Sequence, residues 1–290
     1  MGKIQDAIRK LQSGARDAAQ GSAIEADDVL AQSDAHEAGT HSAFTDTEIG
    51  VEKSEFTYGG PSLALHRDHL ISAGLLDPDQ QRKQMTAEYR QIVRSILRNV
   101  ANLTANGGLR GNTIAVTSTE AGEGSSFLAL NLALALAADP GCTVVLVDAD
   151  VARPDLTKAL KASHASGLSD VVRGDVPDPN QIIMPTDTAR FAFLPVGLHC
   201  DAIDKSVEGS PLAPAIDQLA VASRRRLFVF DIGAFGAERA ASRLASFCGQ
   251  LLLVVESGRT PQKTALDALD HLRSNDTSQA IGIVFNKVVA

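Results

Sequence analysis

The sequence has few cysteines, a deficit of positive charge and no long apolar run. Three cysteines among 290 residues are widely separated and form no C-x-x-C pair, so neither a disulfide framework nor a zinc site is predicted. The net charge of −8 argues against nonspecific binding to nucleic acid or to an anionic membrane. The longest apolar run, residues 127–138, is too short to cross a bilayer, and the N-terminus lacks the apolar core of a signal peptide. These absences predict a cytoplasmic protein.

The first 106 residues are interpreted as three segments. Residues 1–20 are predicted to form an amphipathic helix, whose apolar stripe consists of Ile4, Ala7, Ile8 and Leu11. This stripe fits either a frayed terminal helix or a helix that docks on a partner. Residues 21–60 are rich in small and acidic residues, which predicts a disordered acidic linker. Residues 61–106 are expected to form a helical arm, with one apolar face between residues 89 and 97.

From residue 107 to residue 290, short apolar runs alternate with amphipathic segments. The predicted strands are Thr113–Val116, Thr143–Val147, Phe191–Leu194, Leu227–Phe230, Leu251–Val255 and Ile281–Phe285. The predicted helices are Ser126–Ala138, Pro211–Ala222, Ala237–Phe247 and Pro261–Arg273. Apolar strands that alternate with helices indicate a parallel sheet covered on both faces, joined by right-handed crossovers. The expected fold is therefore a doubly wound, mostly parallel α/β domain.

A glycine-rich turn follows the first of these strands, in the stretch "EAGEGSSFLALN" from Glu120 to Asn131. A strand, a glycine-rich turn and an apolar helix are the layout of a phosphate-binding loop, in which backbone N–H groups and the helix dipole hold the anion. Gly122 and Gly124 permit the tight path, and Ser126 stands where a hydroxyl would coordinate Mg²⁺. A short Gly/Ser turn alone is a weak signal, since such residues are common between any strand and helix.

Aspartates at the ends of two further strands strengthen the interpretation. "TVVLVDADVARP" places Asp148 and Asp150 at the end of one strand, and "RRLFVFDIG" places Asp231 at the end of another. Ligands of open α/β sheets bind at this edge, and carboxylates there are suited to hydrated Mg²⁺. Each aspartate alone is more simply a turn or capping residue. Three of them together with the loop favour a nucleotide site.

With these motifs the chain resembles the cytoplasmic bacterial tyrosine kinases (BY-kinases) of exopolysaccharide synthesis, in particular the exosortase-associated autokinase type. The stretches that carry the resemblance occur in family order. They include "MGKIQDAIRKL", "LISAGLLDPD", "EYRQIVRSILRN", "VTSTEAGEGSSFLALNLALALA", "VVLVDADVARPDL", "GLSDVVRGDV", "FLPVG", "LLLVVESGRTPQKTALDAL" and "GIVFNKV". The pair Asp148-x-Asp150 is the most specific of these features.

The resemblance implies a P-loop NTPase fold of the MinD/ParA type, with ATP and Mg²⁺ as cofactors. It implies catalytic roles for Asp148 and Asp150, and metal ligation by Ser126, Asp148 and Asp231. The cofactor-binding residues it implies are Gly122, Glu123, Gly124, Ser125, Ser126 and Asn286. As partners it implies a membrane polysaccharide chain-length regulator, which recruits the protein to the inner membrane through its cytoplasmic tail, and a homo-oligomer.

The sequence departs from the family pattern where the chemistry is expected. Ser125 stands in place of the loop lysine, and the third motif reads "DIGAFG" without the prolines of the family. The family's tyrosine-rich tail does not appear after "NKVVA". The two tyrosines of the sequence are Tyr58, expected in an exposed linker, and Tyr89, expected to pack on a helix. The helix that forms oligomers in the family is matched only loosely, by Glu88, Gln91 and Arg94.

Three functional hypotheses follow, and they differ in what the missing lysine means. The first is a catalytically impaired regulator whose nucleotide binding is weak or lost. The second is an active autokinase with an unusual loop, in which Arg153 or Arg110 would replace the missing charge. The third is a positioning ATPase of the ParA/MinD type, which the Asp-x-Asp pair and the absence of that group's additional loop lysine disfavour.

Overall fold

The computed structural model describes residues 58–76, 87–105, 110–204, 212–221, 226–235, 239–275 and 279–288. The chain divides by its internal contacts into Met1–Gly50 and Val51–Ala290, and all described residues belong to the second unit. The predictions for residues 1–20 and for most of the linker of residues 21–60 lie outside the described residues.

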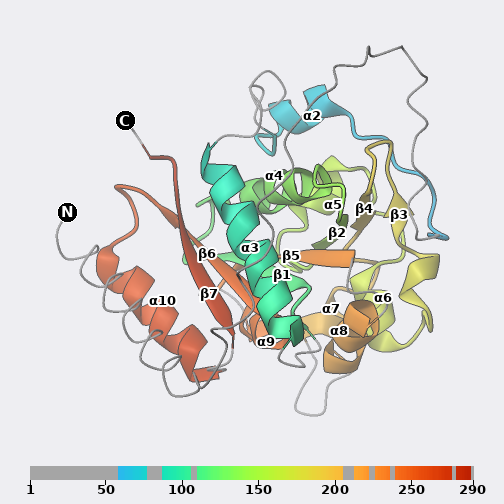
Figure 1. Ribbon diagram of the computed structural model, residues 1–290. Helices are drawn as coiled ribbons and strands as arrows, with labels where there is room; N and C mark the ends of the chain where they lie inside the picture. Colours follow the sequence, from blue (N-terminus) through green and yellow to red (C-terminus); the bar gives the residue numbers. More distant parts are fainter. Residues whose placement is uncertain are drawn as a thin grey trace, which may run out of the picture. The chain divides into compact units, whose positions relative to one another are not determined.

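A single seven-stranded sheet, in the order β3-β4-β2-β5-β1-β6-β7, forms the centre of the described domain (Figure 1). Its strands are β1 (Thr113–Ser118), β2 (Thr143–Asp148), β3 (Met184–Pro185), β4 (Phe191–Leu194), β5 (Arg226–Ala234), β6 (Gln250–Glu256) and β7 (Ala280–Asn286). Neighbouring strands are parallel except for β3 with β4. All six predicted strands are confirmed. The two-residue strand β3 was not predicted, because so short a strand leaves no pattern in the sequence.

Helices cover both faces of this sheet, as the doubly wound prediction requires. They are α2 (Arg67–Ser72), α3 (Ala87–Ala105), α4 (Ser125–Ala137), α5 (Asp155–Ala159), α6 (Leu168–Arg173), α7 (Asp201–Asp204), α8 (Leu212–Val221), α9 (Arg239–Phe247) and α10 (Gln262–Asn275), with a short 3₁₀ turn, η2 (Pro179–Gln181). The four helices predicted after residue 107 are confirmed as α4, α8, α9 and α10. The short elements α5, α6, α7 and η2 were not predicted.

Alternation along the strands divides the core into two layers. In β1, Ile114 and Val116 face one cluster, which also contains residues of α2, α3, α4 and α5. Ala115 faces the other cluster, to which α6, α7, α8, α9 and α10 contribute. Successive strand side chains point to opposite faces of a sheet, so one buried strand supplies both layers. The sheet is therefore buried on both sides, which explains why its strands are continuously apolar.

Helix α4 is buried on nearly all sides, and this places the glycine-rich turn firmly. It lies against β1, β2 and β5 on one side and contacts α3 on the other. Leu130, Leu132 and Leu136 of this helix are fully buried. A helix that is apolar all round belongs to a core, in contrast to a surface helix with one apolar stripe. The first turn of α4 is thus held in a fixed position at the end of β1.

Residues 58–65 run along β3 and the residues beside it. Gly59 and Gly60 donate backbone hydrogen bonds to the carbonyls of Asn180 and Ile183, at 2.8 and 3.1 Å. Leu63 forms an isolated parallel bridge with Thr186. The expectation that Tyr58 lies in an exposed linker is wrong. The local composition hides this pairing, because the partners lie more than 100 positions later in the sequence.

The half-buried ring of Tyr58 packs against the core layer of α6 to α10, and the Arg226 guanidinium lies 5.4 Å from its centroid. Burial raises the pKa of Tyr58 to about 12, although the charge of Arg226 opposes this shift. The hydroxyl oxygen is buried and has no hydrogen-bond partner. Tyr89 is also half-buried, on α3, as expected for a packing residue.

The segment of residues 61–106, expected to be a helical arm, contains α2 and α3. Leu70 of α2 and Val93 and Ile96 of α3 are buried in the same layer as α4. The described part of this segment therefore packs on the domain of residues 107–290, and the division between the two stays a prediction. None of the described helices is long and apolar enough to cross a membrane.

Candidate functional site

The carboxyl ends of the parallel strands gather the predicted site residues at one edge of the sheet. The turn after β1 leads into α4 through Gly122 and Gly124, whose φ angles are 87° and 100°. These positive angles favour glycine, so the two glycines of the motif are required by the backbone path. The first N–H groups of α4 have no partner within the helix, and with the helix dipole they form a ready anion site. Ser125 and Ser126 begin this helix.

The side chain of Glu123 stabilises the base of the turn. Its carboxylate accepts hydrogen bonds from the hydroxyl of Thr119 at 2.8 Å and from the backbone N–H of Glu120 at 2.9 Å. The hydroxyl of Thr260, in the loop between β6 and α10, also donates to it. Glu123 is almost fully buried. The Glu123 side chain is thus used to fix the loop. The resemblance implies that Glu123 binds the cofactor, and the backbone of this residue is the part that remains for such a contact.

The end of β7 holds the outer side of the turn. The amide nitrogen of Asn286 donates to the carbonyl of Glu123 at 2.8 Å, and Lys287 Nζ donates to the carbonyl of Gly122 at 2.9 Å. A Cβ atom added at Gly124 would come 2.2 Å from the Asn286 amide nitrogen. Gly124 is therefore required by this contact as well as by its φ angle. Asn286, predicted to bind the cofactor, lies against the loop itself.

Asp148, the last residue of β2, and Asp231 of β5 are adjacent, and their Cα atoms are partners in the register. The prediction that Asp231 ends its strand is wrong, because β5 continues to Ala234. Asp148 accepts hydrogen bonds from the backbone N–H of Asp150 at 3.2 Å and of Thr157 at 2.8 Å. Asp231 forms a side-chain hydrogen bond with Ser126. The structure thus brings together all three residues that were predicted to hold the metal.

Burial controls the electrostatics of this carboxylate pair. It raises the pKa of Asp148 to about 7, against the opposing hydrogen bonds from Thr157. Burial, followed by repulsion from Asp148, raises the pKa of Asp231 well above its usual range. Two buried carboxylates without a cation are costly, because each disfavours the charge of the other. The pair is therefore suited to a divalent cation.

The fit to Mg²⁺ can be tested on one atom. Asp231 Oδ1 is buried and has no hydrogen-bond partner. A buried carboxylate oxygen without a partner is expensive unless a ligand satisfies it. Mg²⁺ prefers carboxylate and hydroxyl oxygens, and it retains several waters. Asp231, Ser126 and Asp148 are therefore the residues that would hold the ion.

Asp150 lies at the same edge but is less enclosed by hydrogen bonds. Its Oδ1 accepts the backbone N–H of Arg153 at 2.9 Å. Burial raises its pKa, and the backbone N–H and charge of Arg153 oppose the shift. A Cβ atom added at Gly233, whose φ is 69°, would come 2.4 Å from the Asp150 carboxylate. The glycine of "DIGAFG" is therefore what allows β5 to approach Asp150.

Of the two arginines considered as replacements for the loop lysine, the structure contradicts one. Arg110 precedes β1 and forms a bidentate pair with Asp217 of α8, at 2.6 and 2.9 Å. It lies at the amino end of the strand, opposite the loop. Arg153 follows Asp150 and is exposed. Sequence proximity could not distinguish the two, because it does not indicate which end of a strand a side chain occupies.

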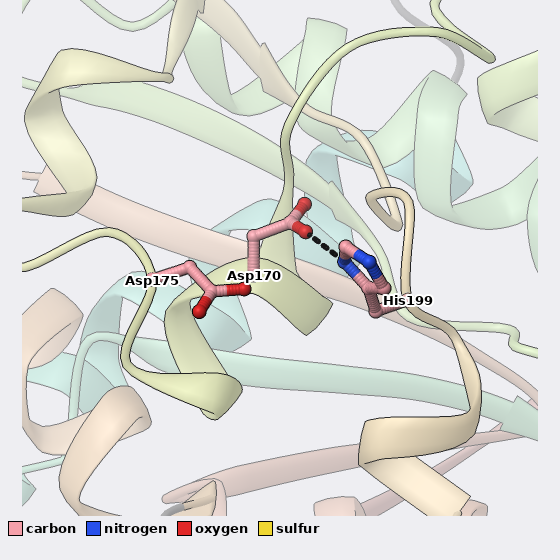
Figure 2. Close-up of side chains that lie close together, drawn as sticks. All are labelled: Asp170, Asp175 and His199. Atoms are coloured by element: carbon pink, nitrogen blue, oxygen red, sulfur yellow. Dashed lines mark hydrogen bonds and ion pairs between the residues drawn. The ribbon is translucent and has the colours of Figure 1, made fainter.

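A second group of polar side chains lies beside the loop that follows β4. The ligand atoms of Asp170, Asp175 and His199 lie within 4.8 Å of one another. Figure 2 shows His199 Nδ1 directed at the Asp170 carboxylate, at 2.8 Å. The other oxygen of Asp170 accepts the backbone N–H groups of Gly167 and Leu198, at 2.7 and 3.2 Å. Asp170 thus joins the start of α6 to this loop, and its oxygens are used for that purpose.

Comparison with known proteins gives this edge of the sheet a context. The chain is 32% identical over 183 residues to the succinoglycan biosynthesis transport protein ExoP of Rhizobium meliloti, which covers 62% of this chain. It spans only 23% of the length of ExoP. It is 26% identical over 215 residues to the tyrosine-protein kinase CpsD of Streptococcus agalactiae, covering 74% of this chain and 89% of CpsD. No protein-family profile matches.

The chain is therefore similar to a bacterial tyrosine kinase and to a transport protein of exopolysaccharide synthesis. The kinase domain of the Escherichia coli tyrosine kinase ETK has the same fold, with a TM-score of 0.55 and 19% identity over 68% of this chain and 75% of that one. The predicted fold class, a doubly wound, mostly parallel α/β sheet with the MinD/ParA-like fold of P-loop NTPases, is confirmed. The family resemblance stated from the motifs is therefore confirmed as well.

Several residues of the site were not predicted as functional. Thr157 binds Asp148 and Thr260 binds Glu123. Thr260 stands in the quoted stretch "LLLVVESGRTPQKTALDAL", but no role was predicted for it. Lys287 was not predicted either, although it directly follows Asn286 in "FNKV" and the loop has serine at its lysine position. The signal that could have identified it was the end of a parallel strand, since every such end reaches the same edge of the sheet.

Proposed function

We propose that this chain is a BY-kinase-like protein of exopolysaccharide biosynthesis, in which Mg·ATP binding is retained in weakened form and phosphoryl transfer is impaired. In this role it regulates a membrane chain-length partner through that partner's cytoplasmic tail. The similarity to the succinoglycan biosynthesis transport protein ExoP supports the pathway, and the similarity to the tyrosine-protein kinase CpsD supports the kinase-like character. The observation that carries the proposal is the Ser126–Asp231–Asp148 arrangement beside a loop whose lysine position is serine.

The physical argument rests on what phosphoryl transfer requires of a protein. Its catalysis is mostly positioning and neutralisation of charge on the phosphoryl oxygens. A serine at position 125 can donate one neutral hydrogen bond but supplies no charge. Loss of a comparable preorganised donor costs about 10²–10³ in rate. The backbone donors and the metal-binding residues remain, so binding is expected to survive better than turnover.

Incubation of the purified protein with labelled ATP and Mg²⁺, with and without the partner's cytoplasmic tail, tests this proposal. We expect nucleotide binding with tyrosine phosphorylation near background in both cases. Asp148→Ala is expected to abolish the Mg²⁺-dependent part of binding. Asp270→Ala, at an exposed position of α10, is the matched control and should bind as the wild type does.

The second candidate, an active autokinase, is favoured by the same preserved carboxylates. Phosphotyrosine that forms in the wild type and disappears in Asp148→Ala would establish it and overturn the impaired form of the proposal. The acceptor would then have to be identified, since Tyr58 and Tyr89 are the two tyrosines of the sequence and both are half-buried.

A further inference from the structure

The loop is held from its outer side through two successive peptide groups. The carbonyl of Gly122 accepts from Lys287 Nζ, and the carbonyl of Glu123 accepts from the Asn286 amide. In a trans peptide the carbonyl and the N–H of the same unit point in opposite directions. With both carbonyls directed at the end of β7, the N–H groups of Glu123 and Gly124 are directed to the opposite side, as in the concavity that binds an anion.

Lys287 also carries charge to this point. Its Nζ lies 3.0 Å from Glu256 Oε2, and Arg259 pairs with the same oxygen at 3.1 Å. Two cations and one carboxylate leave a formal charge of +1 in this group, against the loop. A cation on a carbonyl polarises the peptide and strengthens its N–H as a donor. The Lys287 side chain is about half exposed, at 49%. Its ammonium group can therefore attract an anion in the loop while it stays partly hydrated.

The backbone of Lys287 indicates a position that is fixed. Its φ is 53°, a left-handed conformation that residues with a Cβ adopt rarely. Its N–H donates to Asn286 Oδ1 at 2.9 Å, while the other end of the same amide holds Glu123. One asparagine thus sets both the loop and the direction in which the lysine leaves the strand. Because Asn286 fixes both groups, the Lys287 ammonium reaches the Gly122 carbonyl.

We propose that Lys287 supplies the positive charge of the phosphate-binding loop, in the place of the lysine that position 125 lacks. The inference rests on the proposed nucleotide site and names the residue that keeps it functional. The lysine comes from the end of β7 and acts on the phosphates through the Gly122–Glu123 peptide and through space. Lys287 is in this sense a positioning and charge-supplying residue for nucleotide binding.

Titration calorimetry with Mg²⁺ and a nonhydrolysable ATP analogue tests the proposal on the full chain. We expect Lys287→Met to weaken binding about fivefold, because an exposed, shared cation contributes less than an isolated charged hydrogen bond. Lys287→Arg keeps the charge and should stay within about twofold of the wild type. Lys263→Met is the matched control, since Lys263 pairs with Asp267 on the exposed side of α10.

Lys287→Gln separates charge from simple bracing. Glutamine can still donate a hydrogen bond to the Gly122 carbonyl but carries no charge. If the charge matters, the glutamine variant binds as weakly as the methionine variant, and the salt dependence of binding falls in both. If glutamine binds like the wild type, Lys287 only braces the loop and the proposal is overturned. Melting temperatures without ligand show whether any variant is merely unfolded.

A double-mutant cycle with Ser125→Lys gives the decisive comparison. If the two lysines substitute for each other, Ser125→Lys raises affinity about fivefold more in the Lys287→Met background than in the wild type. Equal gains in both backgrounds overturn the inference about Lys287 while leaving the nucleotide site intact. Absence of binding in the wild type and in every variant overturns the proposed nucleotide site, and the inference with it.

Discussion

Position 125 is the residue at which the chemistry of this site differs most from the BY-kinase pattern. The serine lies in the first turn of α4, and only 8% of its surface is exposed. The surrounding residues, Gly122, Gly124 and Ser126, keep the geometry of the motif. The backbone around position 125 therefore keeps the path of the motif, although the lysine itself is replaced by serine.

Ser125→Lys is expected to raise the affinity for Mg·ATP by about ten- to hundredfold before screening reduces the gain. The reason is one charge-assisted hydrogen bond, which contributes about 1.5–3 kcal/mol. Calorimetric titration with a nonhydrolysable analogue measures it, and Ser125→Met controls for side-chain length without charge. Tyrosine phosphorylation should stay near background. Equal affinities of the wild type and the lysine variant would contradict the expectation.

Tyr58 offers a second test at a single residue. Its hydroxyl is buried without a partner, so its removal in Tyr58→Phe should leave the free energy of unfolding unchanged or raise it by up to about 1 kcal/mol. Tyr58→Ala removes the ring from the core and from Arg226, and should cost about 2–3 kcal/mol. Urea unfolding of the three proteins measures both. A phenylalanine variant that is clearly destabilised would show that the hydroxyl has a stabilising partner.

At the scale of elements, residues 58–65 act as an additional edge segment of the sheet. Gly60 is the position where the segment comes closest to its neighbour, because an added Cβ atom would lie 2.5 Å from the Ile183 carbonyl oxygen. Leu65 completes the pairing, with its backbone N–H donating to the Asp187 carboxylate at 3.2 Å. The segment is therefore fixed by backbone contacts at several points along residues 180–187.

Gly60→Ala should separate this segment from β3 and lower the free energy of unfolding by about 2 kcal/mol or more, because the clash is with backbone atoms that cannot rotate away. Gly141→Ala is the control, since an added Cβ atom there meets only a side-chain oxygen of Asp139, at 3.3 Å. Urea denaturation compares the two. Equal and small effects would mean that the segment contributes little to stability.

The elements also show how far the sequence could predict the site. Apolar runs identified β1, β2, β4, β5, β6 and β7, and the rule that parallel strands end at one edge placed Asp148 and Asp231 together. The helix α4 was recognised from its glycine-rich start. The role of residues 58–65 could not be predicted, since their partners are remote in sequence and their composition resembles a linker. Lys287 was missed for a different reason: a lysine after a strand is usually a solvated residue.

At the scale of the whole molecule, the sheet collects carboxylates that oppose its own stability. Asp148 has a pKa of about 7 in the folded protein and an ordinary value of 3.8. The folded state therefore holds a proton more tightly than the unfolded state, and stability falls as pH rises between about 4 and 7. Asp231, whose pKa is also raised, acts in the same direction.

Without Mg²⁺, the free energy of unfolding should therefore be lower at pH 8 than at pH 5, by on the order of 2 kcal/mol from Asp148. Asp148→Asn should flatten this dependence, and added Mg²⁺ should restore stability at pH 8 in the wild type. Urea unfolding at the two pH values measures it, with Asp270→Asn as control. An asparagine variant with the slope of the wild type would contradict the assignment to Asp148.

The pairing of residues 58–65 with residues 180–187 also has a consequence for the time course of folding. The contact closes a loop of more than 100 residues, and β5, which lies between β1 and β2, is made later still. Contacts between residues so far apart in sequence slow folding, because the entropy of loop closure is lost before the contacts can stabilise the chain. During synthesis on the ribosome, residues 58–65 therefore cannot pair until residues 180–187 have been synthesised, and their apolar side chains stay uncovered until then.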